Sequence, residues 1–206
     1  MSDPIQTTRL LDLVCARLCH DLGGLIGTVG NAMEMVVEDS GDNEVVAFAA
    51  TATRALTQRL RLLRAAWTGE TEPWSLTALR ALLLPALEAR RIVLDTGALP
   101  EACCFSPGFG RVALNVLLLA HDSLPRGGTI TVSGAARDLV VRINGVGAAW
   151  PRGLMGLPRD VEAALVAVED ARGAQTPLTV LLALSRGVRL SPVFGAGAPA
   201  LRLEEG

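Results

Sequence analysis

Two apolar stripes in the first 70 residues limit the folds open to this chain most strongly. In each stripe apolar side chains recur every three or four positions, which places them along one face of a helix. The first stripe comprises Leu11, Val14, Leu18, Leu22, Leu25, Val29, Met33 and Val36. The second, close to a heptad repeat, comprises Val46, Ala49, Thr53, Leu56, Leu60, Leu63 and Trp67. We therefore predict two long amphipathic helices.

A polar segment, "EDSGDNE", separates the two stripes. Gly41 suits a turn and Asn43 suits the cap of a following helix, so the helices should form an antiparallel hairpin. Stripes this continuous need a partner, and pairing of two hairpins into a dimeric four-helix bundle supplies one. A hairpin packed entirely on its own C-terminal domain is the alternative.

The pattern changes after Pro73. Helical spacing is expected near residues 76–89, 109–121, 160–169 and 177–185. Strand patterns are expected at 91–95, twice within 127–145, and at 187–193 and 200–205. The prediction is an α+β fold, with a helical hairpin at residues 1–72 and an α/β sandwich at residues 73–206, one sheet with helices on one face.

Composition excludes several classes of partner. The chain has 206 residues, half of them hydrophobic, and a net charge of −2. No overall positive charge favours nucleic acid or an acidic membrane. No apolar run is long enough to span a bilayer, and the first residues lack the pattern of a secretory signal. We expect a cytoplasmic protein with no nucleic-acid and no membrane partner.

The four cysteines show no paired CxxC spacing, and free thiols are typical of a reducing compartment. A metal site built from Cys15, Cys19 and His20 is disfavoured, because His20 lies about 100° around the helix from Cys19. We expect no bound metal.

The segment "RLCHDLGGLIG" places three glycines beside one of only two histidines. His20 lies about 200° around the helix from both Leu18 and Leu22, so it should point into solvent. Gly23, Gly24 and Gly27 follow on the same face, although each glycine costs a helix roughly 1 kcal/mol relative to alanine. They would clear space for a second protein to approach the imidazole. The alternatives are an ordinary surface histidine and glycines that serve close helix packing.

Three segments, "ARLCHDLGGLIGTVGNAMEMV", "ALNVLLLAHDSLPRGGTITV" and "GAQTPLTVLLALSRGVRLS", resemble the bacterial histidine phosphotransferases of the ChpT type in their order along nearly the whole chain. The resemblance implies a dimeric hairpin that carries a phosphorylated histidine. It also implies an ATPase-like second domain, similar to that of sensor histidine kinases, that no longer binds nucleotide. Members of this family carry phosphoryl groups between receiver domains.

The segment "CHDL" resembles the start of the kinase histidine box. The resemblance makes His20 the phosphorylated nucleophile and Asp21 its acidic neighbour. Asp21 would orient the imidazole through its other nitrogen, unless the carboxylate is simply solvated. Leu25 stands where the box commonly has a proline.

Two motifs of the kinase ATPase domain are incomplete. In "LNVLLLAHD" the first asparagine is kept as Asn115, whereas Leu119 stands in place of the metal-binding one. In "INGVG" Ile143 replaces the aspartate that reads adenine. The retained residues are Asn144, Gly145 and Gly147. The resemblance therefore implies no cofactor bound by this chain, with Mg²⁺ supplied by the receiver.

A hairpin that turns near Gly41 should place Arg61 level with His20. Arg59 and Arg64 lie within a helical turn of that level, and arginine can hold a phosphoryl group. The alternative is that these arginines only solvate a helix face. The residues expected to contact a receiver are Gly23, Gly24, Gly27, Thr28, Asn31, Met35, Phe48, Thr51, Arg61 and Arg64. His121 follows an apolar helical run and is expected to have no chemical role.

The function expected from the resemblance is a phosphoryl carrier in a two-component phosphorelay, without ATP-dependent kinase activity. Its partners would be a second copy of the chain, the receiver domain of a hybrid histidine kinase, and response regulators. Two alternatives are an ATP-dependent histidine kinase and a non-catalytic dimeric scaffold for receivers.

Overall fold

The structure is a computed structural model that describes residues 4–38, 43–68, 72–151, 154, 168, 171–193 and 197–206. Two long helices, α1 (Pro4–Glu38) and α2 (Asn43–Trp67), run side by side in opposite directions. The predicted hairpin is confirmed, and α2 begins at the predicted Asn43. Helix α1 begins before the first stripe, at Pro4, because proline is tolerated in the first turn of a helix. Gly41 lies outside the described residues.

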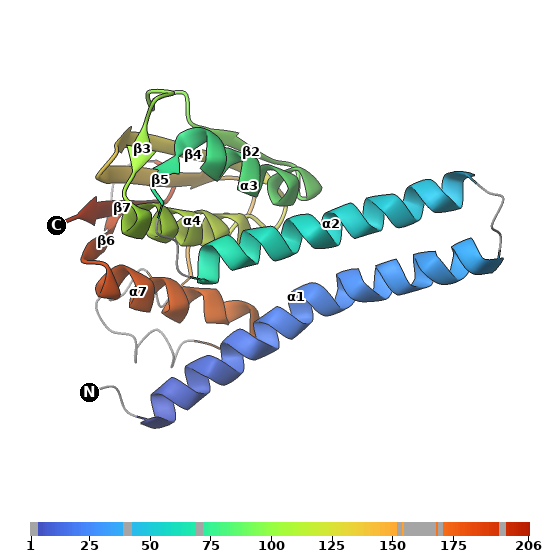
Figure 1. Cartoon of the computed structure of the whole chain (residues 1–206). Helices are drawn as coiled ribbons and strands as arrows, with labels where there is room; N and C mark the ends of the chain where they lie inside the picture. Colours follow the sequence, from blue (N-terminus) through green and yellow to red (C-terminus); the bar gives the residue numbers. More distant parts are fainter. Residues whose placement is uncertain are drawn as a thin grey trace.

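The remainder of the chain forms a sandwich of helices on one mixed sheet (Figure 1). Its first half contains β1 (Trp74–Ser75), α3 (Leu76–Ala89), β2 (Ile92–Asp95), β3 (Cys104–Phe105), α4 (Pro107–Asp122), β4 (Gly128–Ala135) and β5 (Asp138–Asn144). Its second half contains the short η1 (Ala171–Ala174), α7 (Gln175–Ser185), β6 (Val188–Val193) and β7 (Ala200–Glu205). The α+β fold class is confirmed, and the helix expected near residues 160–169 lies outside the described residues.

The five-stranded sheet has the order β2-β4-β5-β7-β6, in which β2 and β4 are parallel and the other pairs antiparallel. Alternate side chains on the central strands point into the core, as expected for a sheet with one covered face. These buried residues are Ile130, Val132, Leu139, Val141, Ile143, Leu201 and Leu203. The strands β1 and β3 pair separately with each other and are too short for sequence periodicity to reveal.

The C-terminal end of α2 is built into the core of the sandwich. Leu62, Ala65 and Ala66 belong to the same hydrophobic cluster as α3, α4 and the sheet. The buried Asn115 amide on α4 donates to the Ala66 carbonyl at 2.8 Å, and Arg111 donates to the same carbonyl at 3.0 Å. Such bonds satisfy carbonyl groups that a helix end leaves unpaired. The hairpin is therefore anchored to the sandwich at this end.

The far end of the hairpin projects beyond the sandwich (Figure 1), so the hairpin does not pack entirely on the C-terminal domain. Part of its apolar surface stays open to solvent: Ile26 is 56% exposed and Val37 78% exposed. The other exposed large apolar residues of the hairpin are Leu11, Met33, Met35, Val46, Phe48 and Leu60. Among the described residues, no helix combines the length and apolarity needed to cross a membrane.

We predict that Asn115→Ala lowers the free energy of unfolding by about 2 kcal/mol, because it deprives buried polar partners of a hydrogen bond. Asn115 also accepts a 2.7 Å bond from the buried Gln175 amide, which the variant would leave short of an acceptor. Urea unfolding followed by tryptophan fluorescence measures the loss. The control, Asn144→Ala, alters an exposed asparagine and should change stability by less than about 0.5 kcal/mol. Equal losses in both variants would contradict the proposed role of the buried amide.

Candidate functional site

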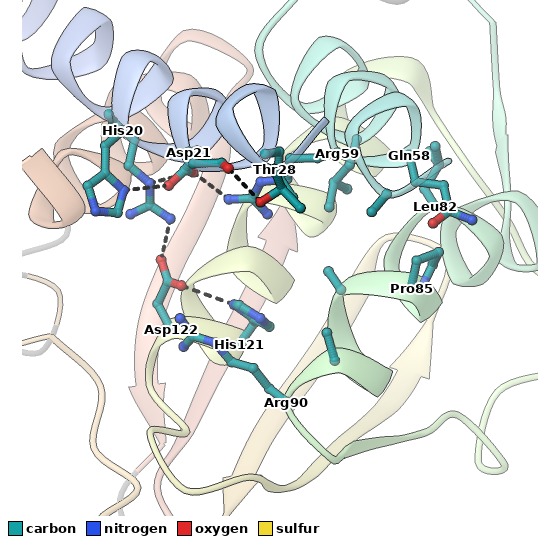
Figure 2. A pocket seen from close by; sticks show the side chains of 17 residues that line it. His20, Asp21, Thr28, Gln58, Arg59, Leu82, Pro85, Arg90, His121 and Asp122 are labelled. Atoms are coloured by element: carbon teal, nitrogen blue, oxygen red, sulfur yellow. Dashed lines mark hydrogen bonds and ion pairs between the residues drawn. The ribbon is translucent and has the colours of Figure 1, made fainter. Parts of the chain in front are cut away.

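A cavity of about 440 Å³ lies where the hairpin meets the sandwich (Figure 2). Both histidines of the chain line it, His20 from α1 and His121 from α4. Helix α2 contributes Gln58 and Arg59, and α3 contributes a mainly apolar wall that includes Pro85. The cavity therefore brings together residues that lie up to about 100 positions apart in the sequence.

The His20 side chain is 54% exposed, as its position opposite the apolar stripe predicts. Its Nδ1 lies 3.2 Å from Oδ1 of Asp21. Because an ionised carboxylate can only accept a hydrogen bond, this contact holds the proton on Nδ1 and leaves the lone pair on Nε2. The imidazole thus presents a nucleophilic nitrogen on the side away from Asp21.

Asp21 is not a solvated side chain, because only 9% of it is exposed. Its Oδ2 accepts a 2.7 Å hydrogen bond from Nε of Arg17 and a second bond from Arg59 across the hairpin. Burial opposes ionisation of the carboxyl, but the hydrogen bonds and charges of the two arginines outweigh it and lower the pKa of Asp21. Asp21 is therefore a fixed negative charge beside His20.

A second histidine–aspartate pair faces the first across the cavity. Nδ1 of His121 lies 3.0 Å from Oδ1 of Asp122, and Nη2 of Arg17 donates to Oδ2 of Asp122 at 3.0 Å. Burial opposes ionisation of Asp122, yet the bond from His121 and the charge of Arg17 lower its pKa to about 2. Arg17 therefore links the carboxylates of the two pairs.

The prediction that His121 lies at a helix end is confirmed, because it is in the last turn of α4, whereas its burial beside the cavity was not predicted. His121 is buried at 7% exposure, paired to Asp122, and lines the same cavity as His20. The sequence did contain a signal, because the chain has only two histidines and an aspartate follows each. Nothing in that repeated "HD" indicates that the two dipeptides meet in space.

Of the three arginines predicted near the level of His20, Arg59 is the one that lines the cavity. Arg61 and Arg64 are exposed, and neither lines the cavity. The pairing of α1 with α2 sets Arg59 opposite Asp21, and a residue two positions further along points about 200° away around the helix. Arg61 therefore points away from the cavity, and its contact with a receiver, like that of Arg64, stays a prediction.

The remaining predicted contact residues are all exposed on the hairpin. They are Gly23, Gly24, Gly27, Thr28, Asn31, Met35, Phe48 and Thr51. A Cβ atom added at any of the three glycines would meet no other atom within 4 Å. Packing within the chain therefore does not require glycine at these three positions. The helix surface beside His20 is open.

Leu119 and Ile143, the two positions at which the sequence departs from the ATPase motifs that it resembles, lie in the core. Leu119 is 1% exposed and Ile143 is fully buried. Neither side chain has a group that ligates a metal or accepts a hydrogen bond. Within the described ranges, no group of three or more His, Cys, Asp or Glu side chains is arranged to hold a metal ion. All four cysteines are free; Cys103 is buried and the others are exposed.

Comparison with known proteins gives concordant matches. Residues 105–194 match the family model of the histidine phosphotransferase C-terminal domain. Protein phosphotransferase ChpT of Brucella abortus (strain 2308) is 27% identical over 93% of this chain and 94% of its own length. The solved 1.7 Å structure of a bacterial phosphotransferase matches with a TM-score of 0.73 at 21% identity. The match covers 99% of this chain and 98% of the phosphotransferase chain.

The fold and the site, an exposed histidine beside a buried aspartate on a helical hairpin joined to an α/β sandwich, agree with these matches. Residues 105–194 match the histidine phosphotransferase C-terminal domain, and the chain is similar to a ChpT phosphotransferase along nearly its whole length.

We predict that Asp122 stabilises the fold only where it is ionised. Its pKa falls from 3.8 to about 2 on folding. A folded-state pKa below the unfolded one stabilises the protein above about pH 4, and this stabilisation is lost as the pH falls towards about 2. The shift corresponds to about 2 kcal/mol.

The free energy of unfolding of Asp122→Asn should therefore be about 2 kcal/mol lower than that of the original chain at about pH 7. Near about pH 2 the two free energies should be equal. Urea titrations across this pH range measure the difference. A difference that persists at the acid end would show that packing, not charge, was lost.

Proposed function

We propose that this chain carries a phosphoryl group on Nε2 of His20, taking it from the aspartate of one receiver domain and passing it to that of another. The observation that carries the proposal is the environment of the His20 imidazole. Its imidazole is exposed, its Nδ1 side is held by a buried, ionised Asp21, and three glycines leave the neighbouring helix surface open.

The chemistry requires little more than this setting. The Nε2 lone pair attacks the phosphorus of an aspartyl phosphate, the N–P bond forms, and the P–O bond to the aspartate breaks as the carboxylate leaves. The proton on Nδ1 stays in place, and Asp21 stabilises the positive charge that develops on the ring. The reverse reaction delivers the group to a second receiver. Receivers supply the Mg²⁺ that neutralises the phosphoryl oxygens.

Receiver domains would dock on the hairpin between His20 and its turn. The exposed side chains there include Thr28, Asn31 and Met35 on α1 and Phe48 and Thr51 on α2. The receiver of a hybrid histidine kinase and response regulators are the expected partners. The chain would act as a carrier and not as an ATP-dependent kinase, because Leu119 and Ile143 offer no anchor for Mg²⁺ or adenine.

A homodimer would cover apolar side chains that the hairpin leaves exposed. Ile26, Met33 and Val37 lie within about 20° of one line along α1, and each is about half exposed or more. This line lies about 120° around the helix from His20, so a second copy could cover it without covering the acceptor. Burial of these side chains in a four-helix bundle supplies the driving force.

We predict that His20→Ala abolishes phosphoryl acceptance and leaves the fold intact, because the side chain buries little surface. Incubation with a receiver labelled on its aspartyl phosphate measures acceptance. The matched variant, His121→Ala, lacks the only other histidine and should still become labelled. Labelled ATP alone should label neither protein. Label on the His20 variant would refute the carrier function, and label from ATP would restore the kinase alternative.

We predict that Gly24→Leu slows transfer by about tenfold or more, because it obstructs the receiver's approach to His20. The same change should raise helix stability by up to about 1 kcal/mol, since the added atoms meet nothing within the chain. Gly24→Ala serves as the graded control, with an intermediate rate and a similar gain in stability. Unchanged rates in both variants would rule out an access role for the glycine.

We predict that Ile26→Arg converts the dimer to a folded monomer, raising the dissociation constant by about a hundredfold or more through an unpaired charge in the interface. Sedimentation velocity across a concentration series measures the change. Val93→Arg alters another exposed apolar residue, 62% exposed on β2, and should leave the dimer intact. If Ile26→Arg remains dimeric, association uses another surface.

A further inference from the structure

We propose that the C-terminal domain positions the phosphoryl-accepting histidine through one guanidinium group, that of Arg17, which is held between Asp21 and Asp122; this rests on the proposed function of His20. Arg17 is a positioning residue, because it acts on His20 through Asp21. The proposal assigns a task in phosphotransfer to a domain whose nucleotide-binding motifs are incomplete.

The guanidinium of Arg17 donates to the two carboxylates through two different nitrogens. Nε donates to Oδ2 of Asp21 at 2.7 Å, within α1, and Nη2 donates to Oδ2 of Asp122 at 3.0 Å, on α4. Arg17 is only 6% exposed, and a buried charge needs paired acceptors of fixed geometry. The planar fork therefore transmits the position of α4 to the Asp21 carboxylate.

The two oxygens of Asp21 have different tasks. Oδ2 accepts from both Arg17 and Arg59, whereas Oδ1 is left to accept from Nδ1 of His20 at 3.2 Å. This division keeps Oδ1 available for the imidazole. It also keeps the proton on Nδ1, and so the lone pair on the attacking Nε2.

Asp122 maintains this division because it occupies Nη2 of Arg17. Without the Asp122 carboxylate, Asp21 is the charged acceptor that attracts both Nε and Nη2, and the bidentate pair that arginine and carboxylate groups favour would form. Oδ1 would then turn from His20 towards Arg17. The tautomer with its proton on Nε2, in which the attacking nitrogen is blocked, would become populated.

Asp122 is itself held in place by the sandwich. His121 binds Oδ1 of Asp122 at 3.0 Å and is buried at the end of α4. The second histidine–aspartate pair is thus an anchor for Arg17 and not a second phosphorylation site. The contacts therefore form one continuous series, from Asp122 on α4 to Arg17, from Arg17 to Asp21, and from Asp21 to His20.

The experiment uses Asp122→Asn in the full chain, because Asp122 lies in the other domain and makes no hydrogen bond or ion pair with His20 among those described. Two quantities are measured: the ¹⁵N chemical shifts of the His20 ring at a pH where it is neutral, and the rate of transfer from a phosphorylated receiver at saturating concentration. We expect a shift from the Nδ1–H towards the Nε2–H tautomer. The saturated rate should fall about tenfold, with the half-saturating receiver concentration unchanged.

Arg17→Met, which keeps an apolar stem and removes the guanidinium, should produce the same two changes. The double variant should be no slower than the slower single variant, because both changes break one chain of contacts. Asp138→Asn is the matched control: it also removes a carboxylate from an arginine pair, with Arg202 on the sheet, and should alter neither quantity. Should Asp122→Asn unfold, Asp122→Glu keeps the charge and displaces it by one methylene, and should shift the tautomer in the same direction.

An unchanged tautomer and rate in folded Asp122→Asn would overturn this inference, while loss of labelling in His20→Ala would still uphold the carrier function. A defect confined to the half-saturating concentration, or additive effects in the double variant, would also overturn it, because Asp122 would then act on the receiver or on stability alone. Continued labelling of His20→Ala would instead remove the proposed function itself.

Discussion

The arrangement of this molecule depends on a buried charge that must be paired. Arg17 lies inside the junction between hairpin and sandwich, and its guanidinium is held by one carboxylate from each. Leaving a buried cation unpaired costs several kcal/mol, so the two carboxylates and the helices that carry them are constrained together. The contacts of Arg17 join α1 to α4, and the cavity and the Asp21 carboxylate beside His20 lie at this junction.

The sandwich uses buried polar groups to hold the end of the hairpin. The Asn115 amide joins the end of α2 to α4 and accepts a hydrogen bond from Gln175 on α7. Leu119 and Ile143 are part of the apolar core. The polar groups of the domain therefore stabilise its junction with the hairpin.

Local patterns predicted most of the secondary structure. The helices at 76–89 and 109–121 and the strands after residue 127 agree with α3, α4, β4 and β5, because periods of 3.6 and 2 residues directly reflect which side chains are buried. The site was predicted in part. His20, its exposure and the open glycine surface follow from one helix, whereas the level of Arg59 depends on how two helices slide past each other, and periodicity does not report that.

The sequence by itself determined the amphipathic hairpin and the exposed face that carries His20, since both depend on residue type and local spacing alone. Only the tertiary structure decided that Asp21 is buried between two arginines and that the distant His121 and Asp122 reach the same cavity. The physical reason is that an ion pair such as Arg17–Asp122 joins residues 105 positions apart. Its geometry is set by the packing of α1 against the sandwich, which no local pattern of residues encodes.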